Sequence, residues 1–361
     1  MAKNKGMTYA QSGVLGLEGL SSWDRFLYWV KRTLKGHPEV KTEIGLYATV
    51  LKIAPNLGLA LSTDGVGTKL LVAEMMGKYD TVGIDCIAMN VNDIICVGAR
   101  PIAMLDYIAL QDATQEYLAE IGKGLYAGAV EAMISIPGGE IAQLKEMIRG
   151  IEEGKGFDLA GCAVGLVDPE KLIIGEGIKE GDVVVGLASS GLHSNGYTLA
   201  RKVLLGNYKI NQYIKHLGKI IGEELLVPTR IYVRPAMAML EQKVKVKAFL
   251  HITGDGFRNL RRVRSKVGFV LDNLPEPPPV FKLIQKLGNV SNEEMANTFN
   301  LGVGFCIVVS EKDAKKVIQI SKKFKIPAWK IGYAVKDPER NIIIPSMKVI
   351  GKAERFYSIQ E

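Results

Sequence analysis

Short apolar runs alternate with amphipathic segments along the whole chain. In the first half the apolar runs predict strands at residues 57–63, 102–109 and 159–167, and the amphipathic segments predict helices at 84–97 and 115–134. In the second half we expect strands at 182–188, 246–253 and 303–309, with helices at 197–205, 257–263 and 311–324. Strands that alternate with helices in this way predict an α/β fold in both halves.

The chain has 361 residues, a length that suggests about two domains. A polar, glycine-rich connection follows Asp168 and Pro169, so we expect an N-terminal domain over residues 1–168 and a C-terminal domain over 169–361. No apolar run approaches the roughly 20 residues of a membrane span. The segment Met1–Ser12 is polar and has no apolar core of a secretory leader, so we expect a cytoplasmic protein with no membrane partner.

Charge and cysteine content narrow the function classes. The net charge of +8 is compatible with a nucleic-acid partner or with phosphorylated small molecules. Neither RNA-binding aromatic motifs nor zinc-finger spacings occur, so we expect no nucleic acid as partner. The four cysteines make no CxxC pair, which disfavours zinc ribbons, iron–sulfur sites and disulfide scaffolds.

The segment Ser62–Lys69, with sequence STDGVGTK, runs from a predicted strand into a glycine-containing loop. Gly65 and Gly67 permit close backbone approach, and Lys69 adds a positive charge, so the loop could hold phosphate oxygens. Its order and spacing are not those of a Walker A loop. On these residues alone, a tight structural turn is an equally good interpretation.

The predicted helix 84–97 carries a polar stripe that we expect to be buried. Asp85, Asn92 and Asp93 lie on one side of the helix, and no Lys, Arg or Glu occurs between residues 81 and 99. Buried carboxylates require a cation or hydrogen-bond donors. Asp85 and Asp93, together with Asp64, would suit Mg²⁺, a cation that takes oxygen ligands beside phosphates. A buried hydrogen-bond network is the alternative interpretation.

Two strand–glycine–helix junctions mark the second half, at SSGLHSNG from Ser189 and at HITGDGF from His251. His193 and His251 lie in these junctions, where a histidine can hold a loop or act as an acid or base. Downstream, Arg258, Arg261 and Arg262 share a helix face, which favours a solvated surface, with a phosphate contact open to Arg258. Gly138–Gly139–Glu140 is predicted as a loop that carries a further carboxylate.

Taken together, these segments resemble the phosphoribosylformylglycinamidine cyclo-ligase family, also called aminoimidazole ribonucleotide synthetases. The matching stretches include STDGVGTK from Ser62, DTVGIDCIAMNVNDIICVGARPIAMLDY from Asp80, GGE at Gly138 and FDLAGCAVG from Phe157. SSGLHSNGYTLARK from Ser189, LLVPTRIYVRP from Leu225, HITGDGF from His251, EMANTFNLGVGF from Glu294 and AWKIG from Ala328 follow in family order.

The resemblance implies an α/β fold of the α+β type. Two N-terminal sheets would pair into a barrel across a homodimer, and each C-terminal sheet would be flanked by helices. It implies a ligase of purine biosynthesis that uses ATP and Mg²⁺ to cyclise formylglycinamidine ribonucleotide to 5-aminoimidazole ribonucleotide, with release of ADP and phosphate.

The resemblance also suggests roles for individual residues. The residues expected at the metal are Asp64, Asp93 and Asp85. Those expected at the ATP phosphates are Asp64, Gly65, Gly67, Thr68, Lys69 and Asn92. Ser190, Gly191, Asn195 and Gly254 are expected to bind substrate. His193, His251 and Glu140 are expected to be catalytic.

Two positions depart from the family pattern. Ile141 stands where the family usually has Thr, and Asp255 stands where it usually has Gly. A carboxylate at Asp255 would repel a substrate phosphate unless it points away or binds a metal. The alternatives are another ATP-using member of the same superfamily, such as a thiamine-phosphate kinase or a maturation factor, or a basic binding module without catalysis.

Overall fold

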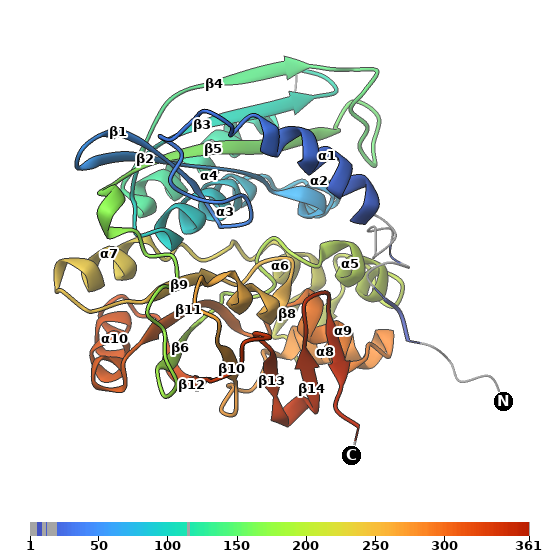
Figure 1. Cartoon of the computed structure of the whole chain (residues 1–361). Helices are drawn as coiled ribbons and strands as arrows, with labels where there is room; N and C mark the ends of the chain where they lie inside the picture. The colour runs from blue at the N-terminus through green and yellow to red at the C-terminus, as the bar shows by residue number, and fades with distance from the viewer. Residues whose placement is uncertain (1–5, 9–11, 13–19, 114–115, 361) are drawn as a thin grey trace.

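The structure is a computed structural model, which describes residues 6–8, 12, 20–113 and 116–360 (Figure 1). Most of the segment Met1–Ser12 and the predicted helix start at Gln115 therefore lie outside the described residues. Within the described part, the strands form two large sheets, one in each half of the chain, and a short hairpin of β7 (Tyr213–Ile214) and β8 (Lys219–Ile220).

The N-terminal sheet has the strand order β1-β2-β5-β3-β4 among the described residues. Its strands are β1 (Thr49–Ala54), β2 (Leu57–Gly65), β3 (Arg100–Leu110), β4 (Ser135–Gln143) and β5 (Phe157–Val167). Neighbouring strands are antiparallel except β3 and β4, which run parallel. The predicted strands at 57–63, 102–109 and 159–167 are confirmed. The prediction of a loop at Gly138–Glu140 is wrong, because these residues lie inside β4.

The helices of the N-terminal half are α1 (Leu20–Arg32), α2 (Leu70–Met76), α3 (Val82–Cys96) and α4 (Tyr117–Ala132). Helix α3 packs on β2 and β5 on one side and on β9 and α7 of the C-terminal half on the other. Helices α3 and α4 approach closely because glycines meet at their contact. A Cβ atom at Gly83 would lie 2.2 Å from the backbone nitrogen of Leu125. Figure 1 shows α3 between the two sheets.

The C-terminal sheet has the strand order β15-β14-β13-β10-β12-β6-β11-β9 over the described residues. Its strands are β6 (Val183–Ala188), β9 (Ala248–His251), β10 (Gly268–Val270), β11 (Val303–Val309), β12 (Ala328–Val335), β13 (Ile342–Ile344), β14 (Val349–Gly351) and β15 (Phe356–Ser358). Strands β6 and β11 are buried along their whole length, which explains their uninterrupted apolar sequences.

The C-terminal helices are α5 (Tyr197–Leu205), α6 (Ile221–Leu225), α7 (Val233–Glu241), α8 (Pro279–Gly288), α9 (Asn292–Thr298) and α10 (Glu311–Lys323). The predicted helices at 197–205 and 311–324 are confirmed. The segment predicted as a helix at 257–263 is instead a 3₁₀ helix, Gly256–Arg262. Of the helices in the described part of the chain, none has the length and apolar composition needed to cross a bilayer.

Candidate functional site

Asp64 lies at the end of β2, where the amide side chain of Asn90 on α3 holds its backbone. The Asp64 N–H donates to Oδ1 of Asn90 at 2.9 Å, and Nδ2 of Asn90 donates back to the Asp64 carbonyl at 3.1 Å. The N–H of Gly65 donates to Oδ1 of Asp64 at 2.8 Å. These bonds fix the carboxylate at the junction of strand and glycine loop. Asn90 was not among the residues predicted for the site.

Asp93, one turn further along α3, approaches the same region and joins it to the C-terminal half. Its Oδ1 lies 2.8 Å from Nδ1 of His251 at the end of β9. Burial, and then the neighbouring charge of Asp93, raise the pKa of Asp64 to about 6. Two carboxylates close enough to repel each other in a partly buried position form a set of oxygen donors that favours a cation.

Asp106 on β3 is a third carboxylate near this region that the sequence analysis did not single out. Asp64 and Asp106 both pair with Gly161 of β5, so the two aspartates flank that glycine in one row across the sheet. Burial raises the pKa of Asp106. The signal in the sequence was an aspartate inside an otherwise apolar strand, IAMLDYIAL.

Lys69 and Asp85 do not lie where the sequence analysis expected them. The Lys69 ammonium forms an ion pair with Asp85 at 2.8 Å and donates to the carbonyls of Val227 and His193 at 2.7 and 3.3 Å. Burial lowers the pKa of Lys69. All three donors of the ammonium are thus used inside the protein. Lys69 thus serves as the cation for Asp85 in this structure, and the expectation that it binds ATP phosphates stays a prediction.

Further bonds of Asp85 and Asn92 reach the C-terminal half, mainly its segment 229–232, and the Ser194 hydroxyl also donates to Asp85. The N–H and hydroxyl of Thr229 donate to Oδ1 of Asp85 at 2.7 and 2.6 Å. Nδ2 of Asn92 donates to the carbonyl of Arg230 at 2.9 Å, and its Oδ1 accepts from the N–H of Tyr232 at 2.9 Å. Asp85 and Asn92 are buried as predicted, and the bonds above join them to protein groups, while their expected roles at metal and ATP stay predictions.

In the part of the chain that the structure describes, no group of three or more His, Cys, Asp or Glu side chains is arranged to hold a metal ion. Of the expected set of Asp64, Asp85 and Asp93, Asp85 lies in the contact with Lys69, and the metal role of the set stays a prediction. Asp64 and Asp93 are the members that remain together.

His193 is 1% exposed and has a left-handed backbone with φ of +64°. Its Nε2 accepts from the N–H of Ser190 at 3.1 Å, and its Nδ1 is buried without a partner. Burial holds the pKa of His193 well below its usual value, so the ring is neutral. In the structure His193 holds its own loop through Nε2, and its role as a proton carrier stays a prediction.

The residues predicted to bind substrate come together in part. Asn195 lies against Gly254, because a Cβ atom added to Gly254 would be 3.3 Å from Oδ1 of Asn195. Nδ2 of Asn195 is buried without a partner. The Ser190 hydroxyl donates to the carbonyl of Pro228 at 2.5 Å. The carbonyl of Gly191 accepts from Asn300. The structure thus brings the two glycine junctions of the C-terminal half into contact through Asn195 and Gly254.

Gly67, Thr68 and Glu140 lie at the margins of this arrangement. Gly67 has φ of +70° with open space where a Cβ would lie, and the hydroxyl of Thr68 is 3.3 Å from that of Thr198. Glu140 pairs with Tyr107, whereas Gly139 pairs with Asp106. Neighbouring strand residues point to opposite faces, so Glu140 is on the other face of the sheet from Asp106. Within one chain, Glu140 does not join the expected catalytic group.

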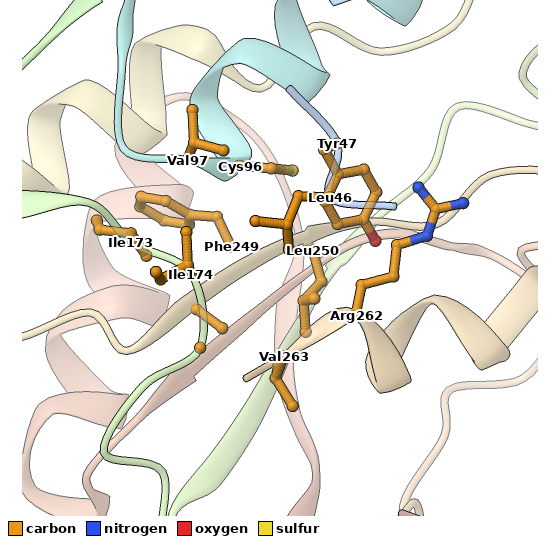
Figure 2. Close-up of a pocket in the computed structure, with 12 residues that line it drawn as sticks. Leu46, Tyr47, Cys96, Val97, Ile173, Ile174, Phe249, Leu250, Arg262 and Val263 are labelled. Carbon is orange, nitrogen blue, oxygen red and sulfur yellow. The ribbon is translucent and has the colours of Figure 1, made fainter. Parts of the chain in front are cut away.

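Tyr47 and Arg262 connect the halves next to His251. The Tyr47 hydroxyl donates to the His251 carbonyl at 2.9 Å, and the Arg262 guanidinium lies 4.7 Å from the centre of the Tyr47 ring. Figure 2 shows these two side chains at the edge of a small pocket lined by apolar residues of both halves. Asp255 faces Arg262 and Arg258 at 3.3 and 3.5 Å. The carboxylate that departs from the family pattern is therefore neutralised by arginines.

Comparison with known proteins identifies the relatives of this chain. Residues 45–167 match the model of the AIR synthase related protein N-terminal domain, and residues 179–345 match that of the C-terminal domain. A phosphoribosylformylglycinamidine cyclo-ligase of Methanocaldococcus jannaschii is 52% identical over 320 residues, which are 88% of each chain.

Two solved structures share the fold at low identity. A thiamine-monophosphate kinase from Stenotrophomonas maltophilia K279a matches with a TM-score of 0.59 and 16% identity, over 88% of this chain and 95% of that one. T. maritima PurL complexed with ADP matches with a TM-score of 0.57 and 15% identity over 86% of this chain, which spans about half (46%) of that one. The domain models and the high identity over most of the chain show that it belongs to the phosphoribosylformylglycinamidine cyclo-ligase family.

Proposed function

We propose that the protein catalyses the ATP-dependent closure of the imidazole ring of formylglycinamidine ribonucleotide in purine biosynthesis. The products are 5-aminoimidazole ribonucleotide, ADP and phosphate. The observation that carries the proposal is the identity of 52%, over 88% of the chain, to a curated cyclo-ligase, and the position of Asp64 at the glycine loop supports it. The fold alone does not separate this reaction from a kinase reaction, because a kinase shares it at 16% identity.

Asp64 and Asp93 are the residues we propose for Mg²⁺. Their mutual repulsion fits a divalent cation, and Mg²⁺ in such enzymes is bound by one or two carboxylates together with substrate phosphates. When bound, the cation would neutralise charge on the phosphates of ATP, the nucleotide implied by the family. His251 holds Asp93 in place through its Nδ1, which makes it a positioning residue in this proposal.

The protein's own contribution to the reaction is orientation and exclusion of water. The glycine loop at Gly65 and Gly67 adjoins Asp64, and backbone N–H groups in such loops hold phosphate oxygens. Asn195 and Gly254 lie against each other, and the unpartnered Nδ2 of Asn195 is available to an acceptor on the substrate. Holding the amide oxygen near the transferred phosphoryl group would supply most of the rate acceleration.

We further propose a homodimer in the cytoplasm. The outer face of the N-terminal sheet exposes Leu105 and Tyr107 on β3, and the edge strand β4 exposes Ile141. In the pairing of β3 with β4, Ile141 lies opposite Ile108, so it is on the other face from Leu105 and Tyr107. Exposed apolar side chains on and beside an edge strand, whose outer backbone groups are unpaired in a single chain, are typical of a surface that a second copy covers. The four cysteines are free thiols, which fits a reducing compartment.

The decisive experiment measures ADP release by the purified protein with ATP and Mg²⁺. We expect turnover with formylglycinamidine ribonucleotide and none with thiamine monophosphate. Mass spectrometry should detect 5-aminoimidazole ribonucleotide in an amount equal to the ADP formed. Turnover with thiamine monophosphate alone would replace the cyclo-ligase proposal with the kinase alternative.

A further inference from the structure

A cavity of about 530 Å³ opens beside Arg262, on the side of Asp255. We call it the arginine pocket. Two carboxylates, from Asp255 and Glu43, lie in its wall. The other charged side chains of the wall are guanidinium groups, which belong to Arg258, Arg261, Arg262, Arg264 and Arg340. The volume lies in the range of small-molecule sites in proteins.

The pocket is built by segments that are distant in sequence. Arg258, Arg261 and Arg262 come from the 3₁₀ helix Gly256–Arg262, and Arg340 comes from the turn before β13. The loop Glu43–Leu46 of the N-terminal half closes another side. Because the wall includes both halves of the chain, it is not the solvated face of a single helix that the sequence analysis favoured for these arginines.

Positive charge in the wall is only partly compensated. Five guanidinium groups face the two carboxylates of the wall, and Glu176 outside the wall forms an ion pair with Arg264 at 2.9 Å, which leaves an excess of two positive charges. Asp255 is shared by Arg258 and Arg262, and Glu43 lies 3.6 Å from Arg264 and is 83% exposed. Among the described residues, no carboxylate forms an ion pair with Arg261 or Arg340.

The arginines also keep hydrogen-bond donors that the protein does not use. Nε of Arg258 is buried without a partner. Arg261 donates through Nη1 to the carbonyls of Glu339 and Arg340 at 3.1 and 2.6 Å, which uses one of its donor nitrogens. Burial, followed by the charges of Arg258 and Arg340, lowers the pKa of Arg261, as expected where like charges are crowded. An anion in the pocket would relieve this repulsion.

We propose that the arginine pocket binds the phosphate group of a small phosphorylated molecule. A phosphate dianion matches the excess charge, and the planar fork of donors on each arginine fits phosphate oxygens. Asp255 supports this role by fixing Arg258 and Arg262 on either side of its carboxylate. The ligand is either the ribonucleotide of the proposed reaction or a separate phosphorylated compound, and the site itself does not depend on which reaction the protein catalyses.

A binding experiment without ATP or Mg²⁺ tests the site apart from catalysis. Isothermal titration calorimetry with ribose 5-phosphate should show binding to the wild-type protein. In the double variant Arg261→Gln/Arg340→Gln the dissociation constant should rise by about 10-fold or more, since each lost bond to a charged group is costly. Absence of wild-type binding, or equal affinity in the variant, would overturn the proposal.

A matched control tests whether binding of ribose 5-phosphate depends on the arrangement of the arginines or only on the positive charge of the protein. Lysines of α10, including Lys323, line another open cavity of about 740 Å³. Lys323→Gln removes one positive charge there and should leave the affinity for ribose 5-phosphate within twofold of wild type. An equal loss of affinity in Lys323→Gln would contradict a specific site. If the double variant fails to fold, Arg340→Lys keeps the charge, removes the fork, and should still weaken binding measurably.

Steady-state kinetics of the double variant separate the two sources of the ligand. A higher KM for formylglycinamidine ribonucleotide, with an unchanged KM for ATP, would assign the pocket to the substrate phosphate. Unchanged KM values together with weakened ribose 5-phosphate binding would assign it to a separate ligand. Both outcomes support the site, and failure of the cyclisation assay itself would leave the calorimetric result intact.

Discussion

Lys69 and Asp85 form an ion pair in which neither side chain is exposed to solvent, with Nζ 2.8 Å from Oδ2. The pair lies at the contact between the two halves, because Thr229 and Ser194 also donate to Asp85. A buried charge left without its partner is expensive, whereas the intact pair with full hydrogen bonding is tolerated. The pair is thus a structural contact whose loss should affect folding before it affects catalysis.

Replacing Lys69 with Met should lower the free energy of unfolding by about 3–5 kcal/mol, because Asp85 would remain buried without its cation. Chemical denaturation measures this change. In an Asp85→Asn background the same replacement should cost clearly less. A Lys69→Met protein of normal stability, with only a raised KM for ATP, would return Lys69 to the role of a phosphate ligand.

Asp93→Asn should abolish ATP-dependent turnover while the far-UV circular dichroism spectrum stays native. Even residues that only support metal ligands typically alter activity 10- to 100-fold, so we expect a loss of at least about 100-fold. The matched control is Asp168→Asn, which alters a carboxylate that bonds locally, to Lys171 and Glu170. Retained activity in Asp93→Asn would remove Asp93 from the proposed metal site.

Stability should fall as the pH decreases below about 6.5, in part because of His193. Its pKa in the folded protein is held below the unfolded value by burial, so the unfolded chain binds a proton that the folded chain does not. The stabilisation is therefore complete above pH 6.5 and is lost below it, by about 1 kcal/mol between pH 7 and 5.5.

His193→Asn isolates this contribution, since Asn tolerates the positive φ at this position. Urea denaturation at several pH values should give a flatter pH profile for the variant than for the wild type. Parallel profiles would mean that His193 takes up its proton in the folded state, which would support the role of proton carrier.

The proposed dimer can be tested on β4. Ile141 is 55% exposed at the edge of the N-terminal sheet, and Tyr213 is 61% exposed in the C-terminal half. Ile141→Lys should shift the protein from dimer to monomer in sedimentation velocity experiments, because a charge would enter the apolar contact. Tyr213→Lys should leave the wild-type state unchanged. A wild-type protein that sediments as a monomer at micromolar concentration would contradict the dimer.

Strong periodicity made much of the fold predictable. The strand Val303–Val309 and the helix Tyr197–Leu205 were predicted with the bounds that the structure has, because a continuous apolar run and an amphipathic face leave few alternatives. β4 was missed because Gly138 and Gly139 are typical of loops, and only pairing with β3 keeps them extended. The domain boundary at Asp168 remains a prediction.

The candidate site was predictable as far as local chemistry determines it. Burial of the polar stripe on α3 followed from the lack of Lys, Arg and Glu around it. The partners of the stripe did not, because Thr229 lies 144 residues from Asp85 in sequence and is brought near only by the contact between the halves. Asp106 was overlooked for the same reason, since its relation to Asp64 depends on the intervening strand β5.

Helix α3 contacts both halves of the chain. It packs on the N-terminal sheet, and its Asp85 and Asn92 form hydrogen bonds with backbone groups of the C-terminal half. A hinge between the halves would have to break these bonds each time it opened. Substrates should therefore enter when loops rearrange, without a rigid-body movement of the two halves apart. For the same reason, heating should melt the chain in a single calorimetric transition instead of two.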